Sequence, residues 1–257
     1  MVQPGRNLVL VQACLNGSRR PEEHLALPVT ADELTDAAYD AVEAGAAALH
    51  VHPRGEDGET TLDPDECAEV LTEIRRACPF VPVGLTTIAS AAANPEERLR
   101  LIRSWTVLPD FASVNLDEEG AEDLCRVLLG MGIGVEAGLS TMQDAHALIR
   151  SELANQCLRI LVEPDAEDGE AAVATASAID HELDHAGASA WRLHHGYGMA
   201  TWAVLRRALQ SGHDIRVGLE DTLQRPDGEE ARDNAELVRY AVDLARRYGR
   251  EPVPTEW

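Results

Sequence analysis

The chain has 257 residues, with 45 acidic against 22 basic residues and a formal net charge of −23. This charge repels phosphate backbones and anionic lipid, so neither a nucleic acid nor a membrane partner is expected. The five cysteines are odd in number and show no C-x-x-C spacing, which argues against a disulfide framework and favours a reducing cytoplasm. No apolar run is long enough for a membrane span, and the N-terminus lacks a signal-peptide pattern.

Short apolar runs alternate with longer amphipathic stretches along the chain, which is typical of βα units that build a parallel sheet. Eight strands are predicted, at residues 8–15, 47–53, 81–87, 111–116, 134–139, 157–163, 190–195 and 215–221. A helix is predicted between each pair of strands, and a last one at 234–248. Eight such units in this length indicate one domain, a single closed (β/α)8 TIM barrel over residues 1–257. An open, doubly wound sheet is the alternative.

Helix boundaries are marked by their capping residues. Residues 30–33 form a capping box, and Asp63 and Asn94 each precede a proline at the first helical position. Glycines stand where a left-handed residue would end a helix, at positions 45, 187, 212 and 249.

Polar residues gather at the predicted carboxyl ends of the strands, which is where TIM barrels carry their active sites. In chain order they are Asn16, His50, His52, Arg54, Thr86, Thr87, Asn115, Glu136, Glu163, His194, His195, Glu220 and Asp221.

His50 and His52 form the strongest candidate site. Residues i and i+2 of a strand share a face, so the two imidazoles can converge on one ion. Glu220 shares strand parity with Arg216, and strands two and eight both flank strand one in a barrel. A two-histidine, one-carboxylate site with an open position for substrate is therefore predicted, against the alternative of a hydrogen-bonded polar pair without metal.

Other polar residues are candidates for acid/base work or substrate contact. Asp221 should turn away from Glu220 and so is available for acid/base chemistry, whereas Arg216 could hold a substrate carboxylate or Asp221. Thr86 and Thr87 could offer hydroxyls to a substrate oxygen. His195 is a candidate substrate contact, although the pattern does not decide whether His194 or His195 faces inward.

Several cofactor chemistries lack support. Residues 196–198 do not complete a dinucleotide fingerprint, and no phosphate-binding P-loop motif is present. All 22 basic residues are arginine, so a Schiff-base lysine mechanism is excluded.

Taken together, these motifs resemble the β-keto acid cleavage enzymes, a family typified by 3-keto-5-aminohexanoate cleavage enzyme. The resemblance covers almost the whole chain and is carried by residues 13–17, 27–30, 44–46, 50–54, 57–58, 216–222 and 234–238. It implies a TIM barrel that binds a divalent metal, usually zinc, and condenses a β-keto acid with acetyl-CoA to give acetoacetate and a new acyl-CoA. It also implies a homo-oligomer, either a dimer or a tetramer.

The resemblance assigns roles to individual residues. It implies that His50, His52 and Glu220 bind the metal, that Asp221 and Arg216 form the acid/base pair, and that Thr86 places a hydroxyl near the reacting carbonyl. The substrate-binding residues expected on this basis and from their position at strand ends are Asn16, Arg19, Arg54, Thr87, Asn115, Glu136 and His195.

The chain departs from the family pattern at two places. Several members carry an acidic residue after strand one, where this chain has Ser-Arg-Arg at residues 18–20. Several also carry Thr-Gly-Gly after strand three, where this chain has Thr-Ile-Ala at residues 87–89. Arg19 in place of an acid suggests a substrate whose far end is neutral or anionic rather than an amine.

Two other functions are compatible with a metal-binding barrel. A hydrolase of the amidohydrolase type also uses an H-x-H motif, but on its first strand, and with further histidines after strands five and six. This chain has Glu136 and Glu163 in those regions instead. A barrel that binds metal without catalysis is the other alternative, and the presence of Arg216, Glu220 and Asp221 argues against it.

Overall fold

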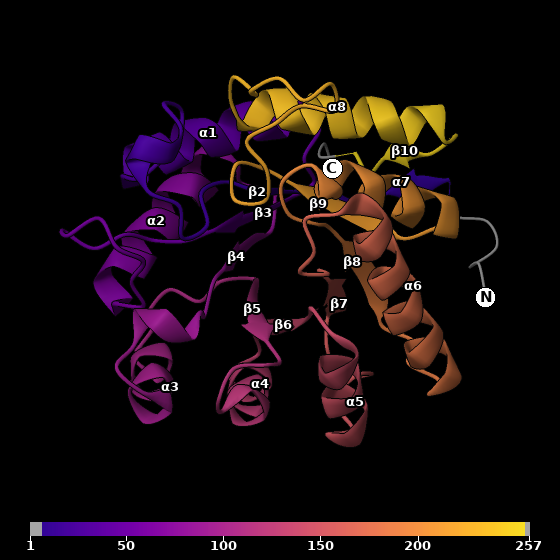
Figure 1. Ribbon diagram of the computed structural model, residues 1–257. Coiled ribbons are helices and arrows are strands. Elements are labelled where there is room, and N and C mark those ends of the chain that lie inside the picture. Colours follow the sequence, from indigo (N-terminus) through magenta and orange to yellow (C-terminus); the bar gives the residue numbers. More distant parts are fainter. Residues whose placement is uncertain (1–6, 255–257) are drawn as a thin grey trace.

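The computed structural model describes residues 7–254 and contains a closed barrel of eight parallel strands (Figure 1). Neighbouring strands follow one another in chain order from β2 to β9, and β9 pairs with β2 to close the barrel. The barrel strands are β2 (Val11–Cys14), β3 (Ala48–Val51), β4 (Val83–Leu85), β5 (Phe111–Asn115), β6 (Gly134–Leu139), β7 (Arg159–Val162), β8 (Trp191–His194) and β9 (Asp214–Val217). The predicted TIM barrel is confirmed, while the two ends of the predicted domain, 1–6 and 255–257, lie outside the described residues.

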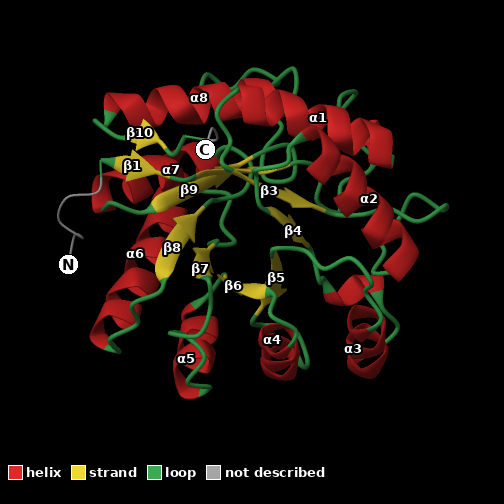
Figure 2. Ribbon diagram, turned by 180° about the vertical axis from the view of Figure 1, so that it is seen from behind, coloured by secondary structure: helices red, strands yellow, loops and turns green. Residues whose placement is uncertain are grey.

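Helices surround the strands as a ring, seen from opposite sides in Figures 1 and 2. They are α1 (Ala31–Glu43), α2 (Pro64–Ala77), α3 (Pro95–Arg103), α4 (Ala121–Gly130), α5 (Met142–Arg150), α6 (Gly169–His185), α7 (Ala200–Ser211) and α8 (Asn234–Arg247), with short 3-10 helices at η1 (Pro21–Glu23) and η2 (Ala89–Ala91). Within residues 7–254 no helix is both long enough and apolar enough to span a lipid bilayer.

The predicted capping residues act as expected. The Thr30 hydroxyl accepts from the backbone of Glu33, and the side chains of Asp63 and Asn94 accept from the first turns of α2 and α3. All four glycines predicted to end helices have positive φ. Local hydrogen-bonding capacity thus fixes where these helices begin and end.

Two predicted strands were wrong in extent. The run 8–15 is divided into β2 and a separate strand β1 (Leu8–Val9), which pairs with β10 (Glu251–Pro252) outside the barrel. The run 215–221 ends as a strand at Val217 and continues as a turn. A Cβ at Gly218 would lie 1.9 Å from the carbonyl oxygen of Cys14, so the backbone approaches β2 too closely here for an ordinary side chain. Glu220 is therefore placed by a turn and not by strand parity.

The lower barrel interior is filled and closes the floor beneath the site. The Phe111 ring occupies the space left by Gly84, where a Cβ would lie 2.0 Å from the ring. The Arg159 guanidinium lies 4.9 Å from the centre of that ring and pairs with Glu136, whose Oε1 also accepts from Gln12 at 2.8 Å. Glu136 is thus an interior ion-pair partner, and burial raises its pKa.

A second polar cluster lies between the barrel and its helices. Asp180 on α6 accepts from Arg192 at 3.0 Å and also pairs with Arg207, while the stacked rings of His194 and His213 lie 4.8 Å apart beside it. His194 therefore faces the helices and not the barrel interior. Burial lowers the pKa of His194 to about 4. Since two guanidiniums already occupy the two Asp180 oxygens, the cluster is an ion-pair network.

We expect Asp180→Ala to destabilise the protein by about 3–5 kcal/mol, because it leaves the buried Arg192 guanidinium without its buried partner. Asp184→Ala is the matched control, since Asp184 is on the same helix and pairs with the same arginine but is largely exposed. Asp184→Ala should lower the free energy of unfolding by no more than about 1 kcal/mol. Urea unfolding measures both, and equal losses would contradict this account.

Candidate active site

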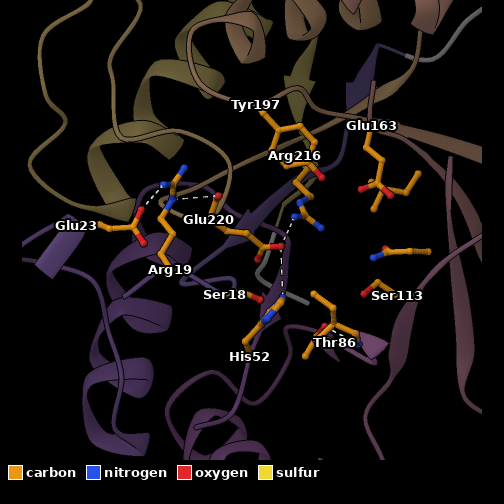
Figure 3. Close-up of a pocket in the computed structure, with 13 residues that line it drawn as sticks. Ser18, Arg19, Glu23, His52, Thr86, Ser113, Glu163, Tyr197, Arg216 and Glu220 are labelled. Atoms are coloured by element: carbon orange, nitrogen blue, oxygen red, sulfur yellow. Dashed lines mark hydrogen bonds and ion pairs between the residues drawn. The ribbon is translucent and has the colours of Figure 1, made fainter. Parts of the chain in front are cut away.

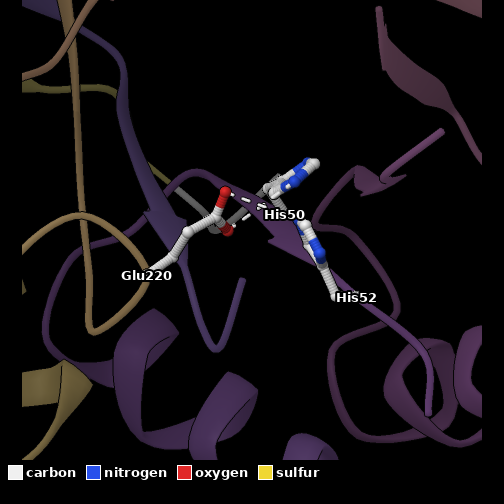
Figure 4. A group of neighbouring side chains, drawn as sticks. All are labelled: His50, His52 and Glu220. Atoms are coloured by element: carbon white, nitrogen blue, oxygen red, sulfur yellow. Dashed lines mark ion pairs between the residues drawn. The ribbon is translucent and has the colours of Figure 1, made fainter. Parts of the chain in front are cut away.

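Three side chains converge at the carboxyl end of the barrel (Figure 4). His50 ends the inward face of β3, His52 follows that strand, and Glu220 reaches them from the turn after β9. The Nε2 atoms of His50 and His52 lie 3.7 Å and 3.5 Å from the two carboxylate oxygens of Glu220. The two imidazoles are 1% and 4% exposed. This juxtaposition confirms the predicted proximity of strands two and eight around strand one.

The donor set fits a divalent cation. The Nδ1 atoms of both histidines and Oε2 of Glu220 are buried without a hydrogen-bond partner, which is costly unless another group satisfies them. Burial lowers the pKa of His50 to about 3, so its imidazole is neutral and can act as a ligand. Two imidazoles and a carboxylate are a common ligand set for catalytic zinc.

Two asparagines fix the backbone that carries these side chains. Asn16 donates to the carbonyl of His52 at 2.8 Å and accepts from its N–H at 2.9 Å. Asn234, the first residue of α8, donates to the Leu15 carbonyl and accepts from the Leu219 N–H. These paired bonds bring the β3 end and the Glu220 turn against the end of β2.

Glycine is required at position 17 for the same convergence. Gly17 has φ +57°, and a Cβ there would lie 2.4 Å from Cγ of Glu220. Any larger residue would push Glu220 away from the histidines.

Arg216 links the Glu220 and Asp221 carboxylates. Its Nη2 lies 2.5 Å from Oε1 of Glu220 and 2.9 Å from Oδ1 of Asp221. The Cys14 thiol donates to the other oxygen of Asp221 at 2.7 Å. Burial alone would raise the pKa of Asp221, but the positive charges of Arg216 and His195 lower it below its ordinary value. Asp221 is thus a buried, oriented carboxylate.

His195 joins Asp221 to Glu163 behind the site. Its Nδ1 lies 3.2 Å from Oδ1 of Asp221, and its Nε2 lies 3.0 Å from Oε2 of Glu163. Burial by itself lowers the pKa of His195, but the two carboxylates outweigh burial and raise it to about 9. His195 is therefore an imidazolium between two carboxylates, and the Tyr197 ring packs edge-on against its ring.

The converging side chains open onto a cavity of about 300 Å³ (Figure 3). Six predicted site residues form part of its wall, namely Arg19, His52, Thr86, Asn115, Arg216 and Glu220. The Thr86 hydroxyl oxygen accepts from the Ile88 N–H at 3.2 Å, so its own hydrogen is available to donate. The cavity wall therefore combines two of the candidate ligands, His52 and Glu220, with neutral donors and the guanidiniums of Arg19 and Arg216.

Other predicted substrate contacts lie outside the cavity wall. The side chain of Arg54 donates to the carbonyls of Gly17 and Arg19, and Thr87 donates to the carbonyl of Ser113. The side chains of Arg54, Thr87 and Asn16 thus form hydrogen bonds with backbone atoms of the protein and position the loops around the site. Glu136 is part of the barrel floor, and His195 and Asp221 are fully buried behind the wall. Some polar side chains at strand ends line the cavity and others stabilise the framework. Sequence spacing alone does not distinguish the two kinds.

The structure adds wall residues that the sequence did not single out, namely Ser18, Glu23, Ile88, Ser113, Leu161 and Tyr197. For Glu163 the sequence indicates only that it ends a strand. The one available signal was position, because Tyr197 and Ser18 also follow strand ends. Glu23 has no such signal, since it reaches the cavity from η1.

Arg19 is already paired. Its Nε donates to the Leu219 carbonyl at 2.6 Å, and its Nη1 lies 2.9 Å from Oε2 of Glu23. Figure 3 shows Arg19 and Glu23 side by side at one end of the cavity. The positive charge of Arg19 is thus balanced by a neighbouring carboxylate.

Comparison with known proteins agrees with this geometry. The model of the beta-keto acid cleavage enzyme family matches residues 8–256. The chain belongs to this family. It is 26% identical over 262 residues to the 3-keto-5-aminohexanoate cleavage enzyme of Fusobacterium nucleatum, covering 95% of this chain and 93% of that protein. It is also 26% identical to the 3-oxoadipate:acetyl-CoA acetyltransferase of Cupriavidus necator, covering 99% of this chain and 93% of that protein.

Solved structures support the fold. ObcA in a binary complex with oxaloacetate aligns with a TM-score of 0.75 at 16% identity, covering 90% of this chain and 66% of that chain. This chain therefore spans about two thirds of the length of ObcA. The family match disfavours the amidohydrolase alternative, and so does the H-x-H motif, which is on the second barrel strand. The chain is an enzyme of the β-keto acid cleavage type.

We expect the paired His195 to make stability depend on pH. Folding raises its pKa from 6.5 to about 9, so this contribution to the free energy of unfolding is complete below pH 6.5 and is lost as pH rises through about 9. Urea unfolding over this range should show a steeper loss for the wild type than for His195→Gln. Parallel losses, or an NMR titration of the ring near its ordinary pKa, would contradict the assignment.

Proposed function

We propose that this enzyme transfers an acetyl group from acetyl-CoA to a β-keto acid, releases acetoacetate and converts the remainder of the keto acid into a new acyl-CoA. In balance, C2 of the keto acid loses a proton and bonds to the acetyl carbonyl, and CoA thiolate leaves. The thiolate then bonds to the former keto carbonyl, the old C2–C3 bond breaks, and C2 regains a proton. The observation that carries the proposal is the family match together with the cluster of His50, His52 and Glu220, of which His52 and Glu220 line the cavity.

We infer that these three residues hold a divalent cation, with zinc favoured by their chemistry. When bound, such a cation would act as a Lewis acid toward the keto oxygen and carboxylate of a β-keto acid. The chain supplies the rest of the site. The Asn16 clamp and Gly17 keep the ligand set together, and Arg216 compensates the charge of Glu220.

Asp221 and Arg216 are proposed as the acid/base pair. Arg216 is in the cavity wall, while Asp221 lies directly behind it and is held as an anion. The pair would accept the C2 proton and return it, with Arg216 facing the substrate and Asp221 receiving the proton through the guanidinium that it binds. The Thr86 hydroxyl, which has a free hydrogen, would donate to a reacting carbonyl oxygen.

The proposal also includes zinc as the resident metal, a dimeric or tetrameric assembly, and a cytoplasmic location. Zinc rests on the donor set, the assembly on the family resemblance, and the location on the five cysteines, which are odd in number and have no C-x-x-C spacing. Metal analysis of purified enzyme and light scattering measure the first two.

We expect removal of the metal by a chelator to abolish formation of acetoacetate from acetyl-CoA and a β-keto acid, and zinc to restore it. His50→Ala and Glu220→Gln should lose bound metal and turnover together, because each removes a ligand. His146→Ala on α5, with its side chain 47% exposed, is the control and should keep both. Full turnover in metal-free enzyme would rule out the proposed site, and loss of stability alone would favour the non-catalytic alternative.

We expect Asp221→Asn to lower kcat by about 10²- to 10⁴-fold while bound metal is retained, because an amide cannot hold the proton that the Arg216–Asp221 pair removes from C2. Asp227→Asn is the control, since Asp227 lies in the exposed part of the same loop. Metal content is measured on the same samples. A variant with unchanged kcat would assign the proton transfer to another group.

A further inference from the structure

Two oxygen atoms converge over Gly138 on the wall of the cavity. Oε1 of Glu163 and Oδ1 of Asn115 lie 2.1 Å and 3.2 Å from the point that a Cβ at Gly138 would occupy. Both residues line the cavity, one following β7 and the other ending β5. Glycine on β6 leaves the space into which both oxygens project. We refer to Asn115, Gly138 and Glu163 as the acceptor corner.

The acceptor corner lies across the cavity from the candidate metal ligands. β6 is four strands from β2 in either direction around the barrel, whereas His50 and Glu220 come from the two neighbours of β2. Figure 3 shows Glu163 and Glu220 on opposite sides of the cavity. A β-keto acid whose keto and carboxylate groups face the ligands would therefore extend its other end toward this corner.

Both oxygens are available as acceptors. Nδ2 of Asn115 donates to Oε1 of Glu118 at 3.3 Å. That carboxylate, which Arg98 also holds, can only accept, so this bond turns the amide oxygen away from Glu118 and toward Gly138. Oε2 of Glu163 is hydrogen-bonded to His195. Among residues 7–254 no group donates to Oε1 of Glu163 or to Oδ1 of Asn115.

We propose that the acceptor corner recognises a hydrogen-bond donor, a hydroxyl or an ammonium, at the far end of the β-keto acid; this rests on the proposed function. A donor placed over Gly138 satisfies two acceptors that otherwise need water. A methyl group there leaves both unpaired, and a carboxylate adds a third acceptor beside Glu163.

The surrounding charges are consistent with this class of substrate. Arg19, which suggested a neutral or anionic far end, is neutralised by Glu23 at the other side of the cavity. The guanidinium of Arg98, which lies beside Asn115 through Glu118, is bound to Glu118 and to backbone carbonyls and so is not free to receive an anion. His195 offsets the charge of Glu163 but leaves Oε1 facing the cavity.

The test is the rate of acyl-CoA formation from acetyl-CoA and a matched series of β-keto acids of one chain length. The series ends in hydroxyl, ammonium, methyl or carboxylate. The wild type should give a kcat/KM for the hydroxyl or the ammonium compound about 10- to 100-fold above those for the methyl and carboxylate compounds, as expected for one or two hydrogen bonds.

Three variants test the corner itself. Asn115→Leu should reduce the preference for donors over methyl about tenfold or more. Glu163→Gln separates the two donors, because loss of its charge should weaken ammonium more than hydroxyl. Gly138→Ala should fill the corner and lower kcat/KM for donor substrates. Gln210→Leu, an exposed amide on α7, is the control for an amide-to-apolar change.

Turnover that favours the methyl or the carboxylate compound, or a donor preference unchanged in Asn115→Leu and Glu163→Gln, would overturn the inference and leave the proposed function standing. Acyl-CoA formation from none of the four compounds, by an enzyme shown to be folded and metal-loaded, would instead overturn the proposed function and the inference with it.

Discussion

The site depends on one buried guanidinium. Arg216 lies inside the barrel between Glu220 and Asp221, two adjacent carboxylates that would repel each other without it. Removing two anions from water is costly, and a shared guanidinium with short hydrogen bonds compensates that cost. Because Arg216 comes from β9 and its register with β2 is fixed by the barrel, the carboxylates are held where the β3 histidines reach them.

The carboxyl end of β2 is the reference point for both halves of the ligand set. Asn16 binds the backbone of His52, and Asn234 binds the turn that carries Glu220. Gly17 and Gly218 allow the chain to approach closely at the same place. These contacts are backbone contacts, so the ligand geometry is a property of the scaffold and does not depend on how the ligands themselves hydrogen-bond.

Polar residues inside this protein serve three different purposes. Gln12, Glu136 and Arg159 close the floor of the barrel, and Asp180 with its arginines joins β8 to α6 and α7. The third group, around Asp221, His195 and Glu163, extends from the buried acid/base candidate to the cavity wall. In the first two groups every carboxylate has a guanidinium partner, whereas in the third Glu163 pairs with the His195 imidazole and leaves Oε1 over Gly138.

The sequence alone determined the eight βα units, the helix ends and the three candidate metal ligands, because hydrophobic periodicity, capping residues and the H-x-H spacing are local signals. It placed Glu220 correctly for a reason that was wrong, since β9 ends at Val217 and a turn delivers the side chain. Only the tertiary structure decided which of His194 and His195 faces the site, and that Asn16, Arg54 and Thr87 bind backbone. The same holds for Asn115 and Glu163, which converge over Gly138 from β5 and β7. Such roles depend on which atoms meet across neighbouring strands and loops, and this is set by barrel register and loop packing, which leave no periodic trace in the chain.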